Sequence, residues 1–221
     1  KRDLKKLFFY IATTTLTWLV INAPVALTHF DGWWRFFKLN IDRGNDLGSL
    51  WYALSLLKLP SADLNYLSLI IFGAAMLGIW NFASKISINR NMYENFMTIA
   101  FISVAAFVTI SKVYSPQYIL WLTPLAVIAM SRREERSAFW VWQAGEAIYH
   151  VAIWQYLASY TGAKFGLPTT IYAVLILVRI ASLAWFVLAL ARTALDRRGD
   201  TQDADYSQLN KAGFLPDSAR G

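Results

Sequence analysis

The sequence predicts an all-α fold, a polytopic transmembrane helix bundle of about six spans with interfacial helices in its first outer loop. Two observations predict it. Charged residues make up 16% of the 221 positions and hydrophobic residues 57%, whereas a soluble domain carries about 25% charged and about 45–50% apolar residues. The apolar residues also gather in runs long enough to cross a membrane, since a helix of about 20 residues spans the hydrocarbon core.

The predicted spans are residues 7–27, 64–83, 95–111, 117–130, 138–158 and 168–191. The fourth is the shortest, and its Pro124 should kink the helix, which neighbouring helices in a bundle tolerate. Lysine and arginine collect in short cytoplasmic loops, and here they collect before the first span, near residues 85–90 and 132–136, and after the last span. This pattern places both ends of the chain in the cytoplasm.

The expected organisation follows from these spans. Residues 1–193 form the transmembrane domain, and the polar residues 194–221 form a disordered cytoplasmic tail. Because the chain opens at Lys1 without a methionine, we expect it to be the C-terminal part of a larger membrane domain. The plasma membrane is the expected location.

Composition also excludes some classes of site. The chain has no cysteine, which excludes disulfides and thiolate metal sites. Its two histidines, His29 and His150, lie far apart, so no metal site is expected. The net charge of +7 is explained by basic loops between apolar runs, so membrane lipids and not nucleic acid are the expected partners.

The first outer loop, residues 28–63, predicts two interfacial helices. One apolar stripe is formed by residues spaced three and four apart: Phe30, Trp33, Trp34, Phe37 and Ile41. Charged residues fall on the opposite side: Asp31, Arg35, Lys38 and Asp42. Such a helix lies flat among lipid head groups, and a second apolar run, residues 50–57, returns to the membrane surface.

Two polar outer turns carry the candidate binding groups. Arg43, Asn45 and Asp46 lie in a glycine-containing turn between the interfacial helices, where a lipid head group would sit. The alternative is a solvated turn in which Asp46 caps the next helix. In the second turn, Lys112 offers a point charge suited to phosphate, beside the hydroxyl of Ser115; the alternative is a snorkelling lysine in an aromatic belt.

Two charged residues lie deep inside predicted spans. Counted from the outer ends near residues 158 and 168, Glu146 and Arg179 both lie about 17 Å deep at 1.5 Å per residue. Charges inside a membrane are usually paired or functional, so we expect an ion pair between the fifth and sixth spans. His150 shares a helical face with Glu146, and a hydrogen bond to that carboxylate is favoured over a proton relay.

The two outer turns resemble those of a polytopic glycosyltransferase of the GT-C superfamily, specifically the C-terminal portion of glycosyltransferase family 87. This actinobacterial type depends on polyprenyl-phosphate sugars. The resemblance rests on Asn22, Ala23 and Pro24, on residues 43–52, and on Lys112 with residues 115–118. It covers roughly residues 7–130 and says nothing about the last two spans.

The resemblance implies transfer of a hexose, most often mannose, from a polyprenyl-phosphate donor to a lipid-linked or cell-envelope glycan acceptor on the outer face of the plasma membrane. No cofactor beyond this donor substrate is implied. Its implied substrate-binding residues are Arg43, Asn45, Asp46, Lys112, Ser115, Gln117 and Tyr118. Lys112, Arg43 and Tyr118 suit stabilisation of the departing phosphate.

The catalytic base of such enzymes lies in an N-terminal outer loop, which a chain starting at Lys1 lacks. Asp46 is a weak candidate for a substitute base, since it equally suits sugar hydroxyls. Two other functions stay open: a transporter or flippase half whose pathway contains the intramembrane charges, and a non-catalytic membrane scaffold of a cell-envelope complex.

Overall fold

The computed structural model describes residues 4–59, 64–86 and 92–211, and this part of the chain is helical with no strand. The chain divides into two compact units, Lys1–Gly44 and Asn45–Gly221. We call them the N-terminal unit and the main unit and describe each by itself.

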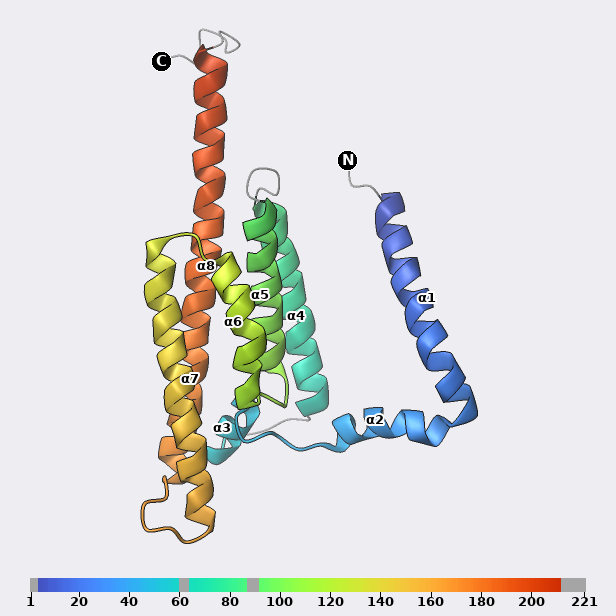
Figure 1. Cartoon of the computed structure of the whole chain (residues 1–221), viewed down its shortest axis with the longest axis vertical. Coiled ribbons are helices and arrows are strands. Elements are labelled where there is room, and N and C mark those ends of the chain that lie inside the picture. Colours follow the sequence, from blue (N-terminus) through green and yellow to red (C-terminus); the bar gives the residue numbers. More distant parts are fainter. Residues whose placement is uncertain (1–3, 60–63, 87–91, 212–221) are drawn as a thin grey trace. The chain divides into compact units, whose positions relative to one another are not determined.

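The N-terminal unit consists of α1 (Leu4–Thr28) and α2 (Phe30–Asp42), which meet at His29 (Figure 1). α1 has no buried residue. The indole nitrogen of Trp33 on α2 donates to the side-chain oxygen of Asn22 on α1 at 3.0 Å, and the rings of Trp18 and Trp33 lie edge to face. The predicted aromatic stripe of α2 is therefore present, and one of its members fixes the bend to α1.

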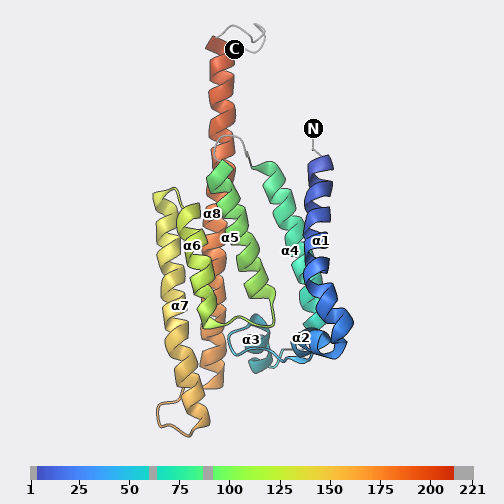
Figure 2. The same ribbon diagram turned by 45° about the vertical axis from the view of Figure 1, so that its right-hand side comes forward.

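The main unit contains the remaining helices. In chain order they are α3 (Leu50–Leu56), α4 (Leu64–Lys85), α5 (Met92–Ile110), η1 (Pro116–Tyr118), α6 (Ile119–Ala129), α7 (Arg133–Tyr160) and α8 (Thr169–Lys211). The longer helices run side by side. α3 lies near one end of α4, α5 and α6, which we call the α3 end, and α7 and α8 continue past it (Figures 1 and 2). The segment that joins α5 to η1 reaches the same end (Figure 2).

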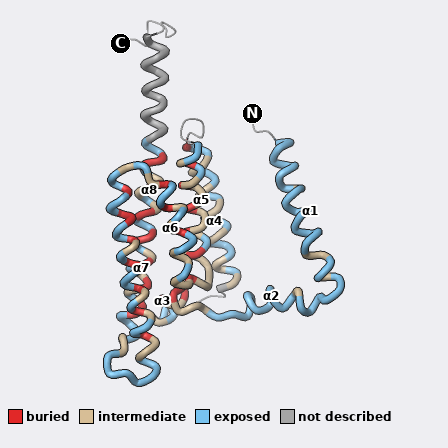
Figure 3. The backbone as a smooth tube through the Cα atoms, viewed as in Figure 1, coloured by how far each residue is buried: buried red, intermediate tan, exposed pale blue. Residues whose placement is uncertain are grey.

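An aromatic cluster on α5, α7 and α8 forms the core of the main unit. The rings of Phe101, Trp142 and Phe186 lie 5.2–5.8 Å apart, and all three side chains are fully buried. Figure 3 shows that buried residues line the inner faces of these helices, while the outward faces are exposed. Those outward faces are apolar, with Leu120 and Trp154 both more than 70% exposed, as expected where lipid is the solvent.

Among the described residues, four helices are long and apolar enough to cross a membrane: Leu4–Thr28, Asn65–Lys85, Met92–Ile110 and Thr169–Asp196. The other two predicted spans are also helices. Pro116–Ala129 is shorter, and α7 is 28 residues long but carries several polar side chains. The chain is thus an all-α, multi-pass membrane protein, as the composition predicts.

The structure differs from the sequence prediction at α3. The prediction places residues 50–57 at the membrane surface, but Trp51 and Ala53 are buried, and α3 packs against α8. The indole nitrogen of Trp51 donates to the carbonyl of Ile110 at 2.7 Å. A small residue at position 53 lets α3 approach its neighbours closely, so α3 belongs to the core and not to the interface.

A second difference concerns the C-terminal segment. The prediction begins a disordered tail at residue 194, whereas α8 continues to Lys211; residues 212–221 lie outside the described part. Proline is the strongest helix breaker, and the sequence has none between Pro168 and Pro216. The change in composition after the last span therefore does not coincide with a helix end.

Candidate functional site

The predicted ion pair is present in the interior of the main unit. The guanidinium Nε of Arg179 on α8 donates to Oε2 of Glu146 on α7 at 2.8 Å, and both side chains are at most 1% exposed. The other carboxylate oxygen of Glu146 accepts from the Tyr114 hydroxyl at 3.1 Å and from the Trp142 indole at 3.2 Å. The carboxylate is therefore fully surrounded by donors, as a buried charge requires.

Arg179 also holds the turn between α5 and η1. Its two terminal nitrogens donate to the carbonyls of Tyr114 at 3.1 Å and Ser115 at 3.4 Å. The guanidinium lies between two aromatic rings, 3.6 Å from the centroid of Tyr114 and 4.2 Å from that of Tyr149, an arrangement that favours a cation. Burial raises the pKa of Tyr114, which keeps its hydroxyl protonated as a donor to Glu146.

The two turns predicted to bind substrate meet at the α3 end. The backbone N–H of Asp46 donates to the carbonyl of Lys112 at 2.8 Å. The Lys112 ammonium donates to the side-chain oxygen of Asn65, at the start of α4, at 2.6 Å. Residues 45–49 and 110–115 are thus one connected structure, although more than sixty positions separate them in the sequence.

Gly48 makes this meeting of turns possible. A Cβ atom at position 48 would collide with the Tyr149 hydroxyl and with the carbonyl of Tyr114. Only a residue without a side chain fits between these two groups. The glycine is required by this close approach and not by a positive φ.

The remaining candidates in the first turn have different surroundings. Arg43 belongs to the N-terminal unit, where it is exposed and its N–H donates to Leu39 at the end of α2. Asn45 is half-buried, and its side-chain oxygen has no hydrogen-bond partner among the described residues. The alternative reading of Asp46 as a helix cap is wrong, because the Ser49 hydroxyl accepts from the N–H of Tyr52 and caps α3.

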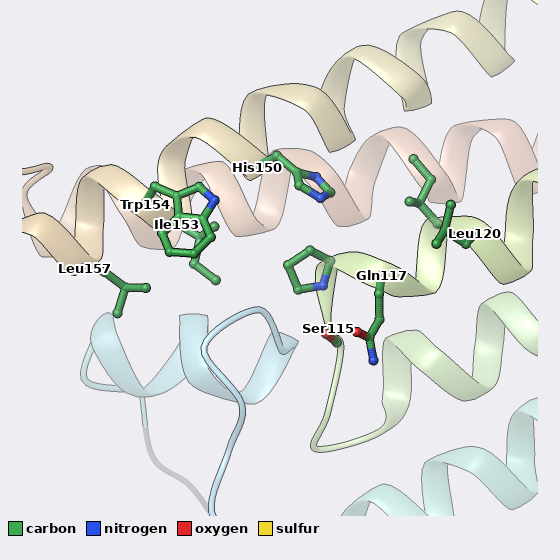
Figure 4. Close-up of a pocket in the computed structure, with 9 residues that line it drawn as sticks. Ser115, Gln117, Leu120, His150, Ile153, Trp154 and Leu157 are labelled. Atoms are coloured by element: carbon green, nitrogen blue, oxygen red, sulfur yellow. The ribbon is translucent and has the colours of Figure 1, made fainter.

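The expected bond between His150 and the Glu146 carboxylate is also wrong. Nδ1 of His150 lies 3.0 Å from the backbone carbonyl of Glu146, while that carboxylate is occupied by Arg179, Tyr114 and Trp142. The half-buried imidazole points from α7 toward η1 (Figure 4). A spacing of four residues places two side chains on one face, but it does not determine which atoms meet.

His150 lines a groove of about 420 Å³ between η1, α6 and α7, which we call the η1–α7 groove. Its lining residues are Ser115, Pro116, Gln117, Ile119, Leu120, His150, Ile153, Trp154 and Leu157 (Figure 4). Two predicted binding residues, Ser115 and Gln117, therefore lie at the groove. Lys112 and Tyr118 do not line it; the Tyr118 ring stacks on Trp121 with centroids 4.6 Å apart.

The sequence prediction missed the α7 wall of this groove. Ile153, Trp154 and Leu157 follow His150 at intervals of three, four and seven residues, so they share one helical face. A polar residue at the head of an apolar helical face was the signal in the sequence. This signal does not predict which element forms the opposite wall of the groove, because only the packing of α6 against α7 creates that wall.

No protein-family model matches the chain, and neither a curated protein nor a solved structure matches it. Among the described residues, no group of three or more metal-ligating side chains could hold a metal ion. The likeness to glycosyltransferase family 87 therefore stays a prediction from the two turns.

Proposed function

We propose that this chain is part of a membrane glycosyltransferase that transfers a hexose, mannose in the simplest case, from a polyprenyl-phosphate donor to a lipid-linked or cell-envelope glycan acceptor on the outer face of the plasma membrane. The observation that carries the proposal is the hydrogen bond from the Asp46 N–H to the Lys112 carbonyl. It joins the two turns that the resemblance identifies as substrate-binding, at one end of the bundle.

A polyprenyl-phosphate suits this location because its phosphate lies at head-group level while its tail enters the apolar region. The ammonium of Lys112 supplies a positive charge at the α3 end. Each buried methylene of a lipid tail contributes about 0.8 kcal/mol, so the tail supplies most of the affinity. The polar groups of the turns are then left to orient the head group and to stabilise the departing phosphate.

We assign Asp46 to binding of the sugar and not to the role of the base. Its backbone N–H and carbonyl fix the turn through Lys112 and Ser49, and its side chain is half-buried beside that turn. The acceptor hydroxyl still requires a base.

The buried charges argue against the transporter alternative. A transport pathway needs ionisable groups that water or substrate can reach, whereas Glu146 and Arg179 are both 0% exposed and pair with each other. Their hydrogen bonds hold the Tyr114 and Ser115 carbonyls in place. They therefore serve the architecture of the site.

The test is sugar transfer by the full-length protein with Lys112→Ala. We expect transfer to fall about 100-fold or more while membrane insertion and the unfolding midpoint stay unchanged. Lys164→Ala is the matched control, because Lys164 is an exposed lysine in the loop between α7 and α8. Unchanged transfer by Lys112→Ala would remove this assignment of the donor site.

A further inference from the structure

Three polar groups of the η1–α7 groove have no hydrogen-bond partner in the described part of the chain. They are the Ser115 hydroxyl, the Gln117 side-chain amide and Nε2 of His150. The other ring nitrogen of His150, Nδ1, bonds to the Glu146 carbonyl. Ser115 directly precedes η1, Gln117 lies on η1, and the His150 ring points from α7 toward η1 (Figure 4). Polar groups at the edge of an apolar cavity commonly fix the orientation of a ligand.

The remaining wall of the groove is apolar and lies on the lipid-facing surface. It consists of the side chains of Pro116, Ile119, Leu120, Ile153, Trp154 and Leu157. Leu120 is 72% exposed and Trp154 is 71% exposed, so the groove opens sideways to the surrounding lipid. An amphipathic molecule with a polar head and an apolar chain fits such a groove.

The absence of charged lining residues favours an uncharged head group over a phosphate. None of its lining residues is lysine, arginine, aspartate or glutamate, and the nearby charges of Arg179 and Glu146 cancel in their ion pair. A phosphate prefers a cationic site, and this groove offers none among its lining residues. An uncharged head group is the better match.

The hydrogen-bonding groups of the groove also favour an uncharged head group. A carbonyl only accepts, so Nδ1 of His150 donates to the Glu146 carbonyl, and in the neutral ring Nε2 is then an acceptor. Ser115 and Gln117 can each donate and accept. A sugar hydroxyl both donates and accepts, so it can bond with each of the three groups, whereas a phosphate dianion supplies acceptors alone.

We propose that the η1–α7 groove binds the hydroxyl-rich head group of an uncharged glycolipid, with the lipid chain along Leu120 on α6. The head group bonds to His150, Ser115 and Gln117. If the proposed function holds, this ligand is the lipid-linked acceptor, bound apart from the donor phosphate at Lys112. The groove itself rests only on its own geometry, so its ligand can be tested without transfer.

The experiment is photolabelling of the full-length protein in nanodiscs. The probes are an alkyl mannoside and an alkyl phosphate that carry the same diazirine in the same chain. We expect the mannoside to label residues 150–157 and 117–120 saturably, with competition by unlabelled alkyl mannoside but not by alkyl phosphate. Stronger labelling of these segments by the phosphate probe would make the groove a phosphate site and overturn the proposal.

Variants test whether the named side chains hold the head group. Trp154→Leu and Gln117→Ala should each weaken mannoside labelling about tenfold, and both residues are exposed, so folding is preserved. Trp140→Leu is the control, because Trp140 is equally exposed on α7 but does not line the groove. Equal labelling of the three variants and the unaltered protein would also overturn the proposal.

Transfer kinetics separate this inference from the proposed function. Under both proposals, Trp154→Leu raises KM for the acceptor and leaves KM for the donor unchanged, while Lys112→Ala affects the donor. Specific mannoside labelling without any transfer would contradict the proposed function and support the glycolipid site. Transfer without mannoside labelling of the groove would support the proposed function and contradict the glycolipid site.

Discussion

Arg179 makes one ion pair and two backbone hydrogen bonds in the interior of the main unit. Arg179→Leu leaves the Glu146 carboxylate buried without its counter-charge, and breaking a buried pair in this way costs about 3–5 kcal/mol. We expect this loss in the free energy of unfolding, measured in mixed micelles titrated with denaturing detergent.

The double variant Arg179→Leu with Glu146→Gln removes the stranded charge and should recover part of that loss. Recovery stays incomplete because the carbonyls of Tyr114 and Ser115 still lack their donor. Equal damage in the single and double variants would contradict a stabilising pair.

Gly48 gives a second prediction at the residue scale. Gly48→Ala places a methyl group against the Tyr149 hydroxyl and the Tyr114 carbonyl, and overpacking of this kind costs about 1–3 kcal/mol. The measurement is again the free energy of unfolding. Gly44→Ala is the control, since a Cβ at position 44 meets nothing within 4 Å; a neutral Gly48→Ala would show that the two turns are not in contact.

The sequence predicted the partners of some residues and not of others. The pairing of Glu146 with Arg179 followed from equal depth in adjacent spans, because a buried charge must find a counter-charge. The partner of His150 did not follow, because the competition among donors for the Glu146 carboxylate depends on Tyr114 and Trp142, which only the folded chain brings to it.

At the scale of elements, the packing of α7 on α8 depends on Gly145. A Cβ at position 145 would lie 2.5 Å from the Ser182 hydroxyl oxygen. Gly145→Ala should therefore separate the two helices and lower stability by about 1–3 kcal/mol, as measured by thermal unfolding in nanodiscs.

Ser182→Ala removes the colliding oxygen, so the double variant should recover most of this loss. The control is Gly78→Ala in α4, where a Cβ meets nothing within 4 Å and alanine is the better helix former by about 0.5–1 kcal/mol. A Gly145→Ala variant as stable as the unaltered protein would show that the helices are not packed at this point.

The existence of the helices followed from the sequence, but the role of α3 did not. Apolar runs and loop charges are properties of local composition, so the membrane-spanning helices can be predicted from the sequence. α3 is seven residues long, and a short apolar run fits either a membrane surface or a protein core. The burial of α3 depends on the contacts of Trp51 and on the close approach that Ala53 allows. Both are contacts of the tertiary structure.

For the whole molecule, the main prediction is the orientation in the membrane. The chain has no cysteine, so single cysteines can be introduced at Gly44, Ala163 and Ser131, all of which are exposed. We expect a membrane-impermeant maleimide to label positions 44 and 163 on intact cells and position 131 only after lysis, because basic loops stay in the cytoplasm. Labelling of only one of positions 44 and 163 from outside would overturn the topology.

The sequence by itself determined that this is an all-α, multi-pass membrane protein. It also predicted the pair of Glu146 and Arg179 from their matching depth in adjacent spans. Apolar content and the positions of basic loops act over short stretches of chain. Only the tertiary structure decided that Asp46 contacts Lys112, that α3 is buried and that His150 opens onto a groove. Those features require segments far apart in the sequence to pack together, and packing depends on shapes and distances that no local pattern contains.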